Sequence, residues 1–293
     1  MHGPRRLASA LPQPAKRVIR RGERRIARAT SHYRLLPDYL IIGAQRSGTT
    51  SLYKYLAQHP GVGAAFLGKG AHFFDKNYSR DLDVYRAHFP TRAYKRYVKV
   101  RRGLELVTGE GSPYYLAHPH APYRIAEALP RVKLIVLLRD PVERAYSHYQ
   151  HELARGFEDL PFEEAIEREP RRLAGELEKM RADPSYDSFS YQHHTYLTRG
   201  RYAEQLEVWY SLFPRGQVLV LPSEELFADP DRTYRRVLEF LGVPPVSLAD
   251  YEAFNPRSYA EMNGAVRRGL VDYFREPNQR LYELIGADFG WSR

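Results

Sequence analysis

The chain has 293 residues, of which 43% are hydrophobic and 27% charged, a composition that supports a buried core and excludes a disordered or collagen-like chain. Cysteine is absent, which excludes disulfides, cysteine-bound zinc, iron–sulfur clusters and thiol catalysis. The formal net charge is +10, but it is unevenly distributed, because residues 1–37 hold ten cations and one anion whereas residues 38–293 hold 35 and 34.

The first 37 residues form a basic arm. Small or apolar residues recur there at helical spacing: Ala15, Val18, Ile19, Gly22, Ile26 and Ala29. This spacing predicts a short basic amphipathic helix, which can lie on an anionic membrane surface or bind a polyanion, or be a solvated arm. No recognised nucleic-acid-binding module accompanies it, so no specific nucleic-acid partner is expected. The chain lacks both an apolar run of membrane-spanning length and a secretory signal, which predicts a cytoplasmic protein, with the arm as its one means of membrane contact.

A phosphate-binding loop is predicted directly after the arm. The apolar run at 39–42 is typical of a buried strand, and it is followed by the loop GAQRSGTT at 43–50 and by a helical pattern that stops near His59. In such an arrangement successive backbone N–H groups can converge on phosphate oxygens at the helix N-terminus, although tight packing alone also uses glycine turns. Gly43 and Gly48 have the spacing of the nucleoside-triphosphatase loop, but Thr49 stands where that loop has lysine. Arg46 is the cation inside this loop.

A second anion site is predicted at the next strong strand. The apolar run at 132–138 leads into Arg139, then into Asp140 as a helix N-cap and Pro141 in the first turn. Ser147 lies two turns into that helix. An arginine at the strand end and this serine can bind one phosphate together. Two anion sites on neighbouring strands predict a doubly phosphorylated nucleotide.

The rest of the chain continues the alternation of strands and helices. We expect one or two surface helices in 157–182, a helix at 202–213, a strand at 217–221 and a helix at 230–241. This order predicts a single doubly wound α/β domain over residues 38–293, with a central parallel sheet and a P-loop-like loop, preceded by the arm at 1–37.

At this point the motifs resemble those of the sulfotransferases that use 3′-phosphoadenosine 5′-phosphosulfate (PAPS). GAQRSGTTSL is similar to the family's 5′-phosphosulfate loop, and RDPVERAYSHY is similar to its 3′-phosphate motif. AHFFD at 71–75, GEGSPYYL at 109–116 and YFREPNQRLYELIGADFGW at 273–291 resemble the heparan sulfate and related carbohydrate branch. The resemblance implies transfer of a sulfuryl group from PAPS to a hydroxyl, or to an amine, of a carbohydrate or glycan-like acceptor, without a metal.

The resemblance also assigns roles to residues. It implies that the 5′-phosphosulfate is bound by Arg46, Ser47, Gly48, Thr49 and Thr50. It implies that Arg139 and Ser147 bind the 3′-phosphate and that Arg257 belongs to a late basic loop closing over the donor. Lys69, His72, Tyr114 and Tyr115 are expected around the acceptor.

The catalytic base is where the sequence departs from the family. The heparan sulfate branch has a glutamate three residues before the double phenylalanine, and this chain has Gly70 there. Three alternatives follow: His72 oriented by Asp75 is the base, Glu110 is the base, or the protein binds PAPS and turns over slowly. A nucleotide kinase is a further alternative, which the missing loop lysine and the pair of Arg139 and Ser147 disfavour.

Overall fold

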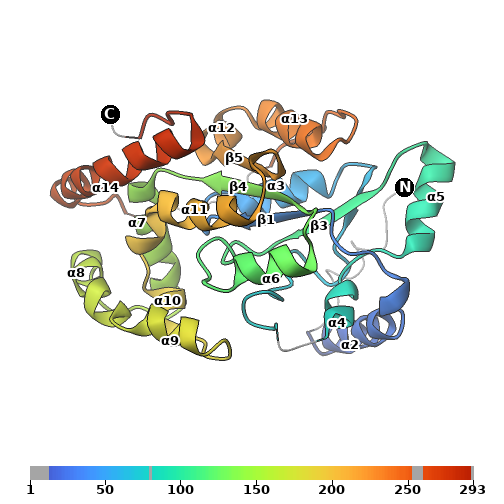
Figure 1. Ribbon diagram of the computed structural model, residues 1–293, viewed down its shortest axis with the longest axis horizontal. Coiled ribbons are helices and arrows are strands. Elements are labelled where there is room, and N and C mark those ends of the chain that lie inside the picture. Colours follow the sequence, from blue (N-terminus) through green and yellow to red (C-terminus); the bar gives the residue numbers. More distant parts are fainter. Residues whose placement is uncertain (1–12, 79–80, 253–259, 292–293) are drawn as a thin grey trace.

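A computed structural model describes residues 13–78, 81–252 and 260–291. Its centre is a five-stranded sheet in the order β2-β3-β1-β4-β5, in which every neighbouring pair is parallel (Figure 1). The strands are β1 (Tyr39–Gly43), β2 (Val62–Ala64), β3 (Val107–Gly111), β4 (Lys133–Leu138) and β5 (Val218–Pro222). The predicted fold class, a doubly wound α/β domain around a parallel sheet, is confirmed.

Helices cover both faces of this sheet. In chain order they are α2 (Gln13–Ala29), α3 (Thr49–Leu56), α4 (Leu82–Arg86), α5 (Arg92–Arg102), α6 (Ala121–Ala128), α7 (Pro141–Leu153), α8 (Phe162–Leu173), α9 (Glu176–Ala182), α10 (Phe189–His193), α11 (Tyr202–Leu212), α12 (Ser223–Ala228), α13 (Pro230–Leu241) and α14 (Gly264–Ile285). Short 3₁₀ turns lie at Ser31–Tyr33, Thr198–Gly200 and Arg215–Gln217. Among the described residues, no helix has both the length and the apolar character needed to cross a bilayer.

The apolar strands divide their side chains between two cores. In β1, Leu40 and Ile42 pack with α6, α11 and α14, whereas Tyr39 and Ile41 pack with α3 and α13 on the other face. Successive strand residues point to opposite faces, so a run that is apolar throughout can be buried on both sides. This is why the sequence shows continuous apolar runs at β1 and β4 rather than an alternating pattern.

The chain brings its predicted motifs to one edge of the sheet. Because the strands are parallel, the loops that follow β1, β2, β3 and β4 all leave from their carboxyl ends, which is where open α/β sheets bind ligands. Helices α8 to α10 form a lobe at one end of the molecule, and α2 and α5 lie at the opposite end (Figure 1).

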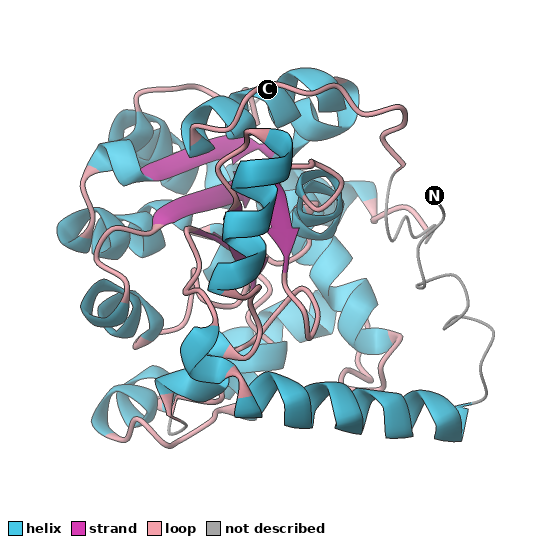
Figure 2. Cartoon of the chain, turned by 90° about the vertical axis from the view of Figure 1, so that its right-hand side faces the viewer, coloured by secondary structure: helices cyan, strands magenta, loops and turns pink. Residues whose placement is uncertain are grey.

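The basic arm contains the helix that was expected, α2, but it joins the body before residue 37. Ala27 in α2 is fully buried, and Arg34 is 6% exposed, with its Nη1 donating a hydrogen bond to the carbonyl oxygen of Phe89 at 2.8 Å. Figure 2 shows α2 projecting sideways beyond the rest of the chain.

Candidate active site

The loop between β1 and α3 contains two glycines at positions where a side chain would press against a neighbouring residue. A Cβ on Gly43 would lie 2.5 Å from Cβ of Leu116, which is closer than any real side chain allows. Gly48, the N-cap of α3, has a left-handed φ of 80°, and a Cβ there would lie 3.0 Å from the ring of Phe227. The loop is therefore pressed against its surroundings, with the backbone N–H groups at the start of α3 directed to the sheet edge.

The two predicted phosphate elements meet in space. Nε of Arg46 donates a hydrogen bond to Oγ of Ser147 at 3.1 Å, although the two residues are 101 positions apart. Nη1 of Arg139 donates to the carbonyl oxygen of Arg46 at 3.5 Å. The three residues that the sequence assigned to two anion sites are thus in contact with one another, and two of them are cations.

A further cation, Lys69, reaches the same loop. Its Nζ donates to Oγ1 of Thr49 at 2.9 Å and to Oγ1 of Thr50 at 3.0 Å. Burial lowers the pKa of Lys69 to about 8, against the opposing effect of the carboxylate of Glu110. From the sequence, Lys69 was expected near the acceptor. In the structure its ammonium instead contacts the hydroxyls of the loop in which Thr49 stands at the usual lysine position.

The loop also holds a buried hydroxyl that fits an anion. Ser47 is 0% exposed, and its Oγ has no hydrogen-bond partner among the residues that the structure describes. A buried hydroxyl left without a partner costs free energy unless a ligand or water satisfies it. Beside Arg46, Lys69 and the α3 N-terminus, this hydroxyl suits a bound phosphate or sulfate group.

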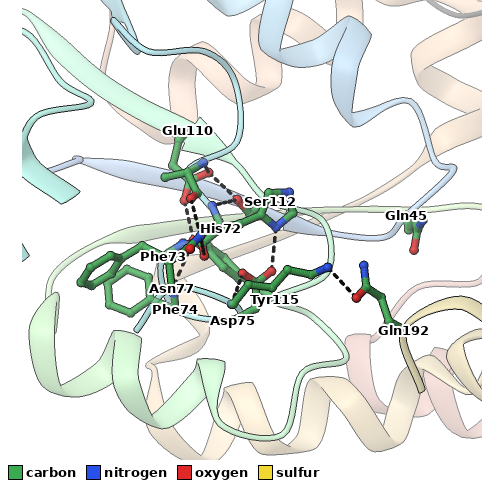
Figure 3. A network of polar contacts seen from close by, with 12 residues as sticks. Gln45, His72, Phe73, Phe74, Asp75, Asn77, Glu110, Ser112, Tyr115 and Gln192 are labelled. Carbon is green, nitrogen blue, oxygen red and sulfur yellow. Dashed lines mark hydrogen bonds and ion pairs between the residues drawn. The ribbon is translucent and has the colours of Figure 1, made fainter. Parts of the chain in front are cut away.

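His72 is held rigidly next to the loop (Figure 3). Its Nδ1 lies 2.8 Å from Oδ2 of Asp75, whose side chain is fully buried, while the imidazole is 41% exposed. Burial alone would lower the pKa of His72, but the hydrogen bond and the charge of Asp75 outweigh it, and the net shift is upward. Nε2 has no hydrogen-bond partner in the described part of the chain, so it is the nitrogen available to accept a proton.

The backbone around His72 is fixed by a buried carboxylate. Oγ of Ser112 accepts a hydrogen bond from the His72 N–H at 3.1 Å and donates to Oε2 of Glu110 at 2.7 Å. Oε2 of Glu110 also accepts from the N–H of Ala71 at 3.2 Å, and Oε1 accepts from the hydroxyl of Tyr115 at 2.9 Å. In Figure 3, Glu110 and Ser112 lie above His72, and Asp75 and Tyr115 lie below it.

This network changes what two predicted residues can do. Glu110 is 0% exposed, burial raises its pKa, and both its carboxylate oxygens accept hydrogen bonds from the protein. Tyr115 is also 0% exposed, and its hydroxyl accepts from the N–H of Phe73 at 2.9 Å. The sequence suggested Glu110 as a base and Tyr115 as an acceptor contact, and the structure encloses both side chains within the protein.

Position 70 adjoins the available nitrogen of His72. A Cβ on Gly70 would lie 3.4 Å from Nε2 of His72, 3.4 Å from Oγ of Ser112 and 3.1 Å from the carbonyl oxygen of Gly111. A side chain at this position would thus enter the same space that His72 faces. The position where the resembling family carries its glutamate is thus next to the edge of an imidazole in this chain.

A cavity of about 490 Å³ opens beside His72. Its lining includes Gln45 from the loop, Lys76 and Asn77, Tyr114, and from the α7–α10 region Arg155, Gln192 and His193. Of the two predicted acceptor tyrosines, only Tyr114 lines this cavity. Cations, amides and an aromatic ring therefore surround the space in front of the proposed proton acceptor.

Sequence reasoning missed the residue that ties the loop to this cavity. Arg199 is 5% exposed, and its Nη1 donates to Oε1 of Gln45 at 2.5 Å. Its Nη2 donates to the carbonyl oxygens of Tyr191 and Gln192, and its guanidinium lies 4.6 Å from the centre of the Tyr114 ring. Arg199 belongs to no sequence motif, and it is recognised as part of the site by its burial in the structure.

The opposite wall of the cavity rests on a second buried carboxylate. Oε2 of Glu152 lies 2.8 Å from Nδ1 of His193 and 3.7 Å from Nη1 of Arg155. Burial would raise the pKa of Glu152, but the hydrogen bonds with His148 and His193 lower it overall. The described residues contain no group of His, Asp and Glu side chains that could hold a metal. The predicted donor contact Arg257 lies outside the described residues.

Comparisons with known proteins agree with this arrangement. The family model named sulfotransferase domain matches residues 36–267. Heparan sulfate glucosamine 3-O-sulfotransferase 3A1 of Mus musculus is 32% identical over 87% of this chain and 64% of its own length. Heparan sulfate glucosamine 3-O-sulfotransferase 6 of Homo sapiens is 30% identical over 88% of this chain and 74% of its own. The chain thus spans slightly less than two thirds of the mouse relative.

A solved structure is also similar. The crystal structure of a sulfotransferase from Alicyclobacillus acidocaldarius shares 32% sequence identity and a TM-score of 0.66, covering 88% of this chain and 100% of that one. The match to the family model extends over the sheet, the loop between β1 and α3 and the helix that carries Ser147. The chain belongs to the sulfotransferase domain family.

Proposed function

We propose that the protein transfers a sulfuryl group from PAPS to a hydroxyl of a carbohydrate acceptor of the glycosaminoglycan type. The observation that carries this proposal is the contact between Arg46 and Ser147, which joins the two predicted phosphate elements next to the His72 cavity. A nucleotide with phosphates at both ends of its ribose needs cations and hydroxyls in both places.

The donor site is built from the loop and its neighbours. Arg46, Ser47 and Lys69 would bind the 5′-phosphosulfate with the hydroxyls of Thr49 and Thr50, and Arg139 with Ser147 would bind the 3′-phosphate. PAPS supplies the sulfuryl group and leaves as adenosine 3′,5′-bisphosphate. Cations fixed before the reaction stabilise the negative charge that grows on the leaving phosphate oxygen, because they need no reorganisation when that charge appears.

His72 acts as the general base in this proposal. Asp75 holds Nδ1, so Nε2 faces the cavity and takes the proton of the acceptor hydroxyl. The acceptor oxygen forms a bond to sulfur while the bond from sulfur to the 5′-phosphate oxygen breaks. The left-handed φ of 48° at His72 supports a functional role, since a strained non-glycine residue persists only where its surroundings fix it.

The acceptor would occupy the cavity in front of His72. Lys76 and Arg155 line it and favour acidic groups, while Asn77 and Gln192 offer amides to hydroxyls. Two of the relatives are named as heparan sulfate glucosamine 3-O-sulfotransferases, which supports an oxygen acceptor on a sulfated glycan.

Arg46→Ala tests the donor assignment. We expect loss of transfer and of adenosine 3′,5′-bisphosphate binding, because a cation on the reacting phosphate is worth at least about tenfold to a hundredfold. Arg168→Ala removes an exposed arginine of α8 and serves as the control that keeps both. Unchanged nucleotide binding by Arg46→Ala would contradict the assignment.

A second candidate function is binding of PAPS with slow turnover, and Gly70 favours it. The matched pair Gly70→Glu and Gly70→Gln separates the two, because both place a side chain of equal size beside Nε2 of His72 and only one can accept a proton. If the protein is an impaired form, glutamate should raise turnover about 10²- to 10⁴-fold over glutamine. If His72 is the base, both variants should slow the reaction by crowding it.

A further inference from the structure

The end of the molecule beyond β2 carries two strongly basic helices. In α2 the exposed side chains include Arg24, Arg25 and Arg28, and its one acidic residue is Glu23. Helix α5 has the sequence RAYKRYVKVRR, with six cations and no acid. Of those six, Lys99 is the one drawn into an ion pair, with Glu105, within the described chain. Among the side chains that the structure describes, most cations of the two helices therefore have no ion-pair partner.

The same helices expose large apolar side chains. Ile26 of α2 is 62% exposed, and Tyr94, Tyr97 and Val100 of α5 are 44%, 54% and 75% exposed. Tyr94 and Tyr97 stack on each other with ring centres 6.3 Å apart, so they form one aromatic surface. Apolar side chains grouped in this way are uncommon on a purely solvated surface.

Part of the apolar side of α2 faces away from the protein. Gly22, Ile26 and Ala29 share one face of the helix, and all three are exposed. Within residues 21–29 of α2, the residue buried against the body is Ala27, which lies about 100° around the helix from Ile26. These three residues of the predicted amphipathic stripe are thus left exposed at the surface of the described chain.

The two helices belong to one surface. Arg34, just after α2, forms an antiparallel bridge with Thr91, which caps α5. The guanidinium of Arg34 lies 5.0 Å from the ring centre of Phe66, and Phe66 and Tyr33 are 42% and 62% exposed at this junction. Figure 2 shows α2 and α5 on the side of the molecule turned to the viewer. We call this surface, made by α2, α5, Tyr33 and Phe66, the basic apolar face.

We propose that the basic apolar face binds the surface of a lipid bilayer that contains anionic lipids. Its arginines and lysines match the negative headgroups, and Ile26, Val100 and the tyrosines match the boundary between headgroups and acyl chains. A sulfated glycan would satisfy the cations but would leave these apolar side chains in water. The proposal does not depend on the function proposed for the donor site.

Sedimentation of the full chain with vesicles tests the charge part of the proposal. We expect binding to phosphatidylcholine vesicles that contain phosphatidylserine and none to phosphatidylcholine alone. The triple variant Arg24→Gln, Arg25→Gln, Arg28→Gln should weaken binding about 10²-fold, at roughly tenfold or less per cation near the surface. The charge-matched control is Arg168→Gln, Arg171→Gln, Arg181→Gln on the lobe at the opposite end, and it should bind like the wild type. Equal weakening by both triples would overturn the proposal.

A second variant separates a membrane from a polyanionic chain. Ile26→Asn with Val100→Asn keeps every charge, and both side chains are exposed, so the melting temperature should stay unchanged. We expect its affinity for phosphatidylserine vesicles to fall at least about tenfold. Its retention on immobilised heparin should not change. Vesicle binding that survives this double substitution, or heparin binding without any vesicle binding in the wild type, would show that the face recognises charge alone and would refute the proposal.

Discussion

His72 is fixed from three directions at once, which is unusual for a residue with an exposed imidazole. Its N–H donates to Ser112, its carbonyl oxygen accepts from Nδ2 of Asn77 at 2.8 Å, and its ring is held by Asp75. These contacts hold a left-handed backbone at a non-glycine residue. In our account this rigidity keeps Nε2 aimed at the acceptor.

The pKa of His72 predicts how activity depends on pH. The base must be neutral, and its pKa lies above 6.5, so kcat/KM should rise with pH through a value above 6.5. Asp75→Asn removes the carboxylate that does most to raise the pKa of His72 and leaves the burial that lowers it. The acidic limb should therefore move to lower pH, with a lower plateau. An acidic limb that stays in place in Asp75→Asn would exclude His72 as the titrating group.

His72→Ala tests the same residue without a titration. Turnover should fall about 10²- to 10⁴-fold, while binding of adenosine 3′,5′-bisphosphate stays close to that of the wild type. His194→Ala is a fair control, since His194 is a nearby histidine that contacts the carbonyl oxygen of Phe157 and does not line the cavity. Equal effects of the two substitutions would point to a general loss of structure.

Deprotonation of Lys69 should produce the alkaline limb in the pH profile of kcat/KM for PAPS. The ammonium form binds the donor, and its pKa is lowered to about 8, so kcat/KM for PAPS should fall as pH rises through about 8. Lys69→Arg should remove this limb, because arginine stays charged. Lys69→Met should lower kcat/KM about 10- to 10²-fold at neutral pH, whereas Lys54→Met, an exposed lysine of α3, should not. A limb that persists in Lys69→Arg would belong to another group.

At the scale of single residues, the sequence predicted which residues lie near the candidate site better than it predicted what each of them does. Arg46, Ser147 and Arg139 were expected at phosphates, and they do come together. The roles of Glu110 and Tyr115 could not be read from the chain, because the hydrogen bonds that bury them come from residues distant in sequence, such as Phe73 and Ala71. Arg199 carries no motif, so nothing in its sequence context connects it to Gln45.

The phosphate loop works as an element whose shape depends on Gly48. Gly48→Ala places a side chain at a φ of 80°, against Phe227 and Leu226 of α12. Gly242→Ala is the matched control, with a φ of 74° and nothing within 4 Å of the added Cβ. Both should lose about 1–2 kcal/mol of stability from the left-handed backbone. Only Gly48→Ala should also lose nucleotide binding, measured by calorimetry; equal nucleotide affinity in the two variants would mean that the loop is not the donor site.

The loop that carries His72 is attached to β3 by Glu110. Glu110→Gln turns one oxygen of a carboxylate that accepts four hydrogen bonds into a donor, so it should destabilise the fold by about 1–3 kcal/mol. Glu169→Gln is the comparable change at a buried carboxylate, one that accepts from the backbone of Leu197 and Thr198. Both should lower the melting temperature, but only Glu110→Gln should lower kcat with little change in KM for PAPS. Loss of activity without loss of stability in Glu110→Gln would instead identify Glu110 as the base.

Elements with a strong pattern were predictable and weak ones were not. The runs at β1 and β4 are apolar throughout, and the helix expected at 230–241 is α13 with the same limits. Strand β3 has the sequence VTGEG, which is neither apolar nor alternating. Its Gly109 is required because a Cβ there would lie 2.3 Å from the carbonyl oxygen of Tyr39 in β1. Contact with a neighbouring strand, rather than local preference, makes this segment a strand.

At the scale of the whole molecule, the strongly basic surface and the proposed active site lie in different regions. The basic helices α2 and α5 lie at one end of the described chain (Figure 1), whereas the proposed donor site uses a few fixed cations at the carboxyl edge of the sheet. The basic apolar face and the acceptor cavity are built from different elements. Substitutions in α2 and α5 should therefore change where the protein binds and leave its rate on a small soluble acceptor unaltered, which an assay without vesicles checks. A large fall in that rate would mean that the two regions are coupled.

The most direct test of the central claim is mass analysis of the products formed from PAPS with a panel of glycosaminoglycans, simple sugars, phenols and lipids. We expect one added sulfuryl group on an oxygen of a glycosaminoglycan, with transfer by Arg46→Ala reduced at least about tenfold and a strongly reduced rate by His72→Ala. Sulfation confined to phenols or lipids, or transfer by Arg46→Ala at the wild-type rate, would contradict this expectation.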